Sequence, residues 1–188
     1  KSNMNLDPVL VSGIENEPWK EANIENYIIV YGYAGRFAEE EKQAIVEFAH
    51  KNKLKTISLC DYQDFCDQHI VCRPDEILGY FKKANYIVTD TFHGTIFSAK
   101  YAKKFAVIVR QFGTFCRSKS NTGSTNQEKL LDLLHRLQLE NQLIKDVRNL
   151  ETALTSEIDY ESVDLIREQE KAKSINYLRA NISIPKER

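Results

Sequence analysis

Short apolar runs alternate along this chain with segments long enough to form helices, and this alternation limits the folds open to it. The runs with the composition of buried strands are residues 27–31, 54–59, 86–89 and 105–109. The segments with helical character are residues 37–52, 74–83, 94–103 and 125–137. Strands that alternate with helices build a parallel sheet covered by helices on both faces. The sequence therefore predicts an α/β fold, a Rossmann-like three-layer domain with a mainly parallel sheet.

Local signals support two of these helices. Pro74 suits a first helical position, and Asp75 and Glu76 place acidic groups in the first turn. Thr125 and Glu128 have the spacing of a capping box. Between the second apolar run and Pro74 the chain is polar, which predicts a loop.

The two ends of the chain depart from the alternation. Residues 1–22 are interpreted as a linker, 23–158 as the Rossmann-like domain, and 159–188 as a long helix with a tail. Residues 167–171 in that helix are mostly charged, so it is not expected to be buried along its whole length. Two alternatives stay open: a surface helix packed by its ends, or a helix that crosses toward another part of the polypeptide.

One histidine, His93, lies where a strand is predicted to end and a helix to begin. In an open parallel sheet the ligand crevice lies outside the carboxyl ends of the strands, where helix amides face a bound anion. Asp90 has two roles open to it, bonding a ring nitrogen of His93 or capping the helix. Gly94 removes a side chain where a ligand approaches the backbone, and Thr95 adds a hydroxyl. A purely structural His93, bonded to Asp90, is the competing interpretation.

The formal net charge of −1 hides a local excess of positive charge. Between Asp90 and Glu128 there is no acidic residue, and the basic residues are Lys100, Lys103, Lys104, Arg110, Arg117 and Lys119. The three lysines are interpreted as the solvated end of a helix. Arg110, Arg117 and Lys119 follow the next strand and are candidate anion ligands, because ligand contacts concentrate in strand-end loops. The basic stretch is too limited to indicate a nucleic-acid partner.

Composition excludes several other classes. A chain of 188 residues suits one domain, and no apolar run approaches the ~20 residues that a membrane span needs. The four cysteines, at positions 60, 66, 72 and 116, include no C-x-x-C pair, so reduced thiols and no metal site are expected.

The run D-T-F-H-G-T-I-F-S, residues 90–98, resembles the signature of the polysaccharide pyruvyltransferase family. Residues 27–33, 62–66, 72–78 and 123–130 agree with this resemblance, which extends over residues 6–180. The resemblance implies a GT-B-like enzyme of two Rossmann-like halves, of which this chain is the C-terminal, donor-binding half. It also implies that the N-terminal half of the polypeptide is absent here. The C-terminal half is then expected to fold by itself but to form no product alone.

The activity implied by the resemblance is transfer of a pyruvyl group from phosphoenolpyruvate to a pair of sugar hydroxyls, which forms a ketal on a cell-surface polysaccharide or its precursor. His93 is then the acid or a phosphate ligand. Asp90, Gly94, Thr95, Arg110, Arg117 and Lys119 are the candidate substrate-binding residues. The resemblance implies no cofactor or metal, and a saccharide acceptor that is free or lipid-linked. It also implies a location in the cytoplasm or at the inner face of the membrane. The catalytic base is expected in the absent half.

Two other functions remain open on the sequence. One is a GT-B-like glycosyltransferase donor domain that binds a nucleotide sugar, although residues 91–127 lack the carboxylate that often holds ribose hydroxyls. The other is a non-enzymatic domain that binds an anion or a protein partner.

The basic strand-end loop leads to a first prediction. Changing Arg117 to Ala should weaken binding of phosphoenolpyruvate by about 1 to 3 kcal/mol, the loss expected for a charge-assisted hydrogen bond, with stability nearly unchanged. Isothermal titration measures the loss, and Lys103→Ala is the control. Equal small losses in both variants would mean that the basic residues act only as a diffuse field.

Overall fold

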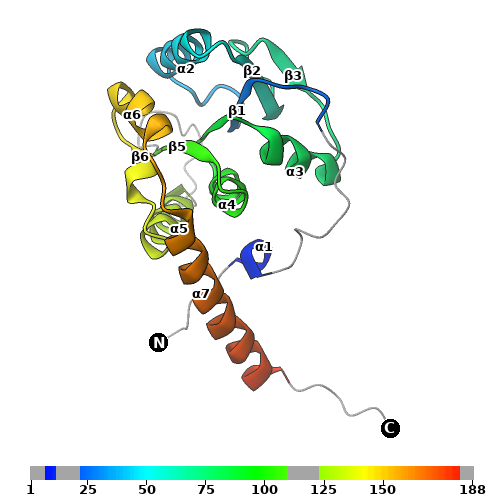
Figure 1. The fold of residues 1–188 in the computed structure, drawn as a ribbon, viewed down its shortest axis with the longest axis vertical. Helices are drawn as coiled ribbons and strands as arrows, with labels where there is room; N and C mark the ends of the chain where they lie inside the picture. Colours follow the sequence, from blue (N-terminus) through cyan, green and yellow to red (C-terminus); the bar gives the residue numbers. More distant parts are fainter. Residues whose placement is uncertain (1–6, 12–21, 110–122, 183–188) are drawn as a thin grey trace. The chain divides into compact units, whose positions relative to one another are not determined.

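The computed structural model describes residues 7–11, 22–109 and 123–182 (Figure 1). The chain divides into two compact units. One comprises residues 19–158, and the other combines residues 1–18 with residues 159–188.

The larger unit contains a six-stranded sheet in which every pair of neighbouring strands is parallel. Its strands are β1 (Tyr27–Gly32), β2 (Lys55–Cys60), β3 (Gln68–Ile70), β4 (Tyr86–Thr89), β5 (Lys104–Ile108) and β6 (Leu143–Ile144). Its helices are α2 (Glu39–Lys51), α3 (Pro74–Lys83), α4 (Phe92–Lys100), α5 (Gly123–Arg136) and α6 (Leu150–Thr155), with 3-10 turns at Glu140–Gln142 and Val147–Asn149. The strand order β3-β2-β1-β4-β5-β6 is the doubly wound order of dinucleotide-binding folds. The predicted α/β fold is confirmed.

Helices cover both faces of this sheet, as Figure 1 shows for α2 and α6 on one side and α3 and α4 on the other. Ile28 and Val30 of β1 join the core cluster that includes side chains of α2 and α6. Tyr31 faces the opposite layer, where its ring meets Phe81 of α3 edge-on at 5.2 Å and Phe97 of α4 at 6.5 Å. Because both faces are buried, the central strands read as continuous apolar runs, which is why the sequence identified them.

The strand order reverses between β1 and β4. These two strands pair in register from Ile28 opposite Tyr86 to Tyr31 opposite Thr89. The chain leaves β1 toward β2 on one side and leaves β4 toward β5 on the other. In open α/β sheets this is the topological switch point, and ligands bind outside the carboxyl ends of the two strands.

The polar loop predicted between the second strand and Pro74 is partly wrong, because its middle forms β3. This edge strand pairs with β2 through Ser58 opposite His69, and Ser58 Oγ lies 3.0 Å from His69 Nδ1. The preceding Asp67 accepts bonds from Thr56 N at 2.7 Å and Thr56 Oγ1 at 2.9 Å. A three-residue edge strand needs no apolar run, since polar side chains are tolerated at an edge. The two-residue strand β6 and the six-residue helix α6 were not predicted from the sequence either.

The smaller unit contains α1 (Pro8–Val11) and the long α7 (Tyr160–Asn181), which contact each other. The predicted C-terminal helix is therefore present, with Asp159 as its N-cap accepting from Ser162 N at 3.1 Å. Leu165 and Leu178 are exposed. The segment boundaries predicted at residues 22 and 158 stay predictions. Among the helices that the structure describes, none is both long and apolar enough to cross a membrane.

The contact between Asp67 and Thr56 yields a stability prediction. Asp67→Ala should lower the free energy of unfolding by about 1 to 3 kcal/mol, because the buried Thr56 amide loses its acceptor. Asp64→Ala is the matched control, since Asp64 pairs with Lys42 at the surface and its loss should leave stability nearly unchanged. Urea denaturation measures both variants, and equal effects would contradict a structural role for Asp67.

Candidate functional site at the switch point

A network of threonine hydroxyls fixes the turn between β4 and α4. Thr89 Oγ1 donates to the carbonyl of Tyr31 on the neighbouring β1 at 2.7 Å and lies 3.0 Å from Thr91 Oγ1. Thr91 Oγ1 in turn accepts from Gly94 N at 3.0 Å and is the N-cap of α4. The prediction that Asp90 caps this helix is therefore wrong, because the threonine one residue later has the capping geometry.

His93 occupies the second position of α4 and is exposed. Its ring contacts Phe92 at 5.7 Å and Phe97 at 6.3 Å between centroids. Within the described part of the chain, its imidazole makes no hydrogen bond, so the predicted bond to Asp90 is absent. Its two ring nitrogens therefore have no protein partner among the described residues.

Asp90 pairs instead with Arg36, which is not among the candidate substrate-binding residues. Arg36 Nη1 lies 3.4 Å from Asp90 Oδ2, with the arginine side chain 42% exposed and the aspartate side chain 0% exposed. The guanidinium also stacks over the ring of Tyr33, 5.0 Å from its centroid. The pair joins the loop after β1 to the turn after β4, across the switch point. The only signal in the sequence was a cation in a strand-end loop, and many loops carry one.

The loop that carries Arg36 is held from the opposite side by the loop after β2. Asp61 Oδ2 accepts from Ala34 N at 3.1 Å, and the buried side chain of Gln63 donates from Nε2 to the carbonyl of Gly32 at 3.0 Å. A Cβ at Gly32 would lie 2.7 Å from Asp90 Oδ1. The two strand-end segments therefore approach so closely that only glycine fits there.

Two of the other predicted ligand contacts have structural partners. A Cβ on Gly94 would clash with Thr89 Oγ1, so packing explains this glycine. Thr95 is fully buried, and its hydroxyl donates to the carbonyl of Thr91 at 3.0 Å. Their contact with a ligand stays a prediction, and the proposals below do not depend on it.

The lysines near α4 differ from the predicted solvated helix end. Lys100 is only 7% exposed, and α4 ends there. Burial lowers the pKa of Lys103. Lys104 opens β5 and pairs with Glu157 at 2.9 Å. Arg110, Arg117 and Lys119 lie outside the described residues, so their role as anion ligands stays a prediction.

Two cysteines are described as free thiols, Cys66 and Cys72. Burial, followed by the charge of Asp67, raises the pKa of Cys66 to about 12. A thiol with so high a pKa is protonated and weakly nucleophilic at neutral pH. Cys66 is therefore no candidate nucleophile.

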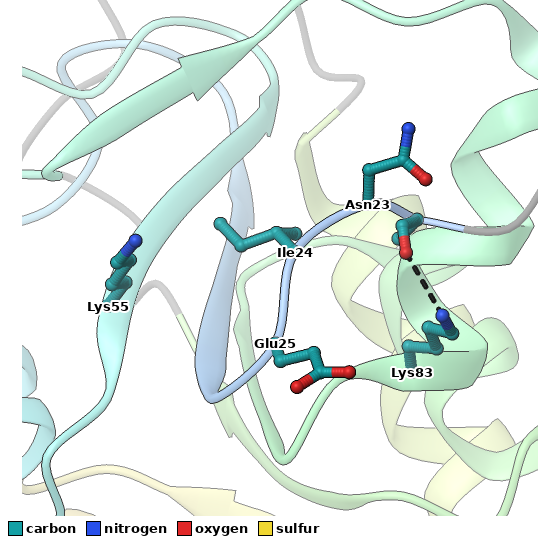
Figure 2. Close-up of a pocket in the computed structure, with 6 residues that line it drawn as sticks. Asn23, Ile24, Glu25, Lys55 and Lys83 are labelled. Carbon is teal, nitrogen blue, oxygen red and sulfur yellow. Dashed lines mark hydrogen bonds between the residues drawn. The ribbon is translucent and has the colours of Figure 1, made fainter.

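A hollow of about 560 Å³ lies at the opposite end of the sheet, among the described residues (Figure 2). It is lined by residues 22–25 before β1, Lys55 at the start of β2 and Lys83 at the end of α3. Lys83 Nζ donates to the carbonyl of Ala22 at 3.1 Å. This hollow is polar and contains no histidine. We therefore place the candidate site at the carboxyl ends of β1 and β4, whose following segments carry the Arg36 guanidinium and the exposed His93 imidazole.

The larger unit is thus a doubly wound α/β domain whose switch point carries groups suited to a small anion. A family model described as Polysaccharide pyruvyl transferase matches residues 1–111, more than half of the 188 residues. The chain belongs to this family. The match includes β1 to β5 and the turn with His93.

Comparison with solved structures gives more distant similarities. The chain resembles a structure titled as the glycotransferase of kitacinnamycin, with 12% identity and a TM-score of 0.47, over 85% of this chain and 42% of that one. It also resembles the glycosyltransferase SnogD from Streptomyces nogalater, with 11% identity and a TM-score of 0.42, over 87% and 44%. This chain therefore spans less than half of those two proteins, and we draw no functional argument from them. A search among curated protein sequences found no match.

The contact between Gly94 and Thr89 can be tested by a double-mutant cycle. An alanine in place of a helical glycine usually stabilises, by up to about 1 kcal/mol, but Gly94→Ala should destabilise by about 1 to 3 kcal/mol through overpacking. In a Thr89→Ala background the penalty should shrink, because the nearest clashing atom is gone. Thermal unfolding of the four proteins measures the coupling, and strictly additive effects would refute the contact.

Proposed function

We propose that this chain is the donor-binding part of a polysaccharide pyruvyltransferase. In this proposal the enzyme transfers a pyruvyl group from phosphoenolpyruvate to two hydroxyls of a saccharide and forms a ketal. The observation that carries the proposal is an exposed His93, in a chain of this family, at the topological switch point of its sheet. That is the position at which α/β sheets bind ligands.

The reaction sets definite requirements. A proton must be added to the methylene carbon of phosphoenolpyruvate, which leaves positive charge on the neighbouring carbon. The two sugar oxygens then bond to that carbon as the bond to phosphate breaks. The two hydroxyl protons leave, one to restore the acid and one to a base or to the released phosphate. The site therefore needs an acid, a base and cations or amides that hold two anionic groups.

His93 fits the acid or the phosphate ligand in this scheme. An imidazole changes its protonation near neutral pH, which few other side chains do. Within the described part of the chain, the backbone N–H groups of Phe92 and His93 donate to no acceptor, so the start of α4 offers N–H donors to an anion. A ligand at this helix start would meet the ring and the amides together.

Replacing His93 by Asn tests this role. In the active enzyme that contains this chain, turnover should fall by the ~10²- to 10⁴-fold typical of a lost general acid. The melting temperature should barely move, because the exposed imidazole makes no hydrogen bond to the described residues. Steady-state assays with phosphoenolpyruvate and a saccharide acceptor, together with thermal unfolding, provide the two measurements.

His50→Asn is the matched control, since His50 is an exposed histidine in the last turn of α2. Near-normal turnover in a stable His93→Asn protein would remove His93 from the mechanism. Titration of the chain with a nucleotide sugar tests the donor: binding of that ligand in place of phosphoenolpyruvate would favour a glycosyltransferase instead.

A further inference from the structure

The geometry points to Arg36 as an anion-binding residue of the switch-point site, with Asp90 and Tyr33 as its positioning partners. We infer that its guanidinium holds phosphate or carboxylate oxygens of a small anionic ligand. The identity of that ligand as phosphoenolpyruvate rests on the proposed function. The assignment of Arg36 itself rests on the contacts described next.

Strand pairing brings the segments that carry Arg36 and His93 to the same end of the sheet. β1 and β4 are neighbours, with Tyr31 opposite Thr89 at their carboxyl ends. Arg36 follows β1, and its ion pair reaches Asp90, three residues before His93. A cation and an imidazole from separate loops thus lie on either side of the point where ligands of such sheets bind.

The guanidinium is both fixed and accessible. Asp90 is fully buried behind it and binds one nitrogen, Nη1, at 3.4 Å, while the arginine side chain remains 42% exposed. A guanidinium has five N–H donors in a planar fork, so one contact leaves donors for two oxygens of a phosphate or carboxylate. A surface arginine normally loses rotamer freedom when it binds, and a side chain already held in place loses less.

Two further contacts hold the group and its loop. The ring of Tyr33 lies against the guanidinium at 5.0 Å, a cation–π arrangement. The backbone of the loop is bonded at Ala34 by Asp61 and at Gly32 by Gln63, which is 2% exposed. A loop secured at two points and a side chain secured at two points constitute a preorganised donor, which a solvated surface arginine is not.

The competing interpretation is that Arg36 only neutralises a buried carboxylate. Both interpretations predict that Arg36→Ala destabilises the fold, because the cation beside a buried aspartate is lost. They differ once the charge is removed as well. The double variant Arg36→Ala/Asp90→Asn should regain stability under both, but under our assignment it should still fail to bind the anion.

The test is isothermal titration of the 188-residue chain with phosphoenolpyruvate and, separately, with inorganic phosphate, beside thermal unfolding. Arg36→Ala and the double variant should bind either probe about 10- to 100-fold more weakly, the loss of one charge-assisted contact. Arg36→Lys should lie between them and the original protein. Arg148→Ala is the control, because Arg148 is an exposed arginine that pairs with an aspartate elsewhere in the chain.

Tyr33 tests the positioning role. Tyr33→Ala should weaken binding several-fold, and Tyr33→Phe should restore it, because the ring and not the hydroxyl faces the guanidinium. Unchanged affinity in both variants would show that Tyr33 does not position the guanidinium.

The outcomes separate the two proposals. Unchanged affinity in the folded double variant would overturn the assignment of Arg36 and leave the proposed donor intact. Binding of phosphate through Arg36, without binding of phosphoenolpyruvate, would support the assignment of Arg36 as an anion-binding residue. It would contradict the proposal that phosphoenolpyruvate is the donor. Binding of neither probe by the original chain would overturn both.

Discussion

The parallel pairing of β1 with β4 is the constraint on which the rest of this structure depends. These strands are separated along the sequence by two other strands and two helices, yet Thr89 Oγ1 bonds the carbonyl of Tyr31 across them. The sheet order reverses at this pair, so the loops that follow it diverge and leave room for a ligand. Because the pairing is in register to the last residue of β4, Arg36 and His93 lie in segments that follow the carboxyl ends of neighbouring strands.

The turn after β4 contains hydrogen-bonded threonines and one exposed histidine. Thr89, Thr91 and Thr95 direct their hydroxyls toward backbone groups or one another, and Gly94 leaves the space that Thr89 fills. His93 lies among them and is exposed, without a hydrogen bond to the described residues. The hydrogen bonds of the threonines fix the backbone of the turn that carries the exposed imidazole.

The sequence predicted the elements that a local rule controls. Strands buried on both faces produce continuous apolar runs, and a proline with acidic neighbours indicates the start of α3, so these were identified within a few residues. β3 and β6 were missed because short strands near the sheet edges need no such run. The histidine was found because it lies within a distinctive motif. Arg36 was not among the predicted site residues, because its ion pair with Asp90 depends on which strand lies beside β1.

The sequence by itself determined the α/β class, the family and the position of His93, since each rests on residues that are neighbours along the chain. Only the tertiary structure decided the ion pair between Asp90 and Arg36 and the choice of Thr91 as helix cap. The reason is physical. Hydrophobic periodicity and motifs are local properties, whereas an ion pair between two loops exists only after parallel strands from distant parts of the chain have paired.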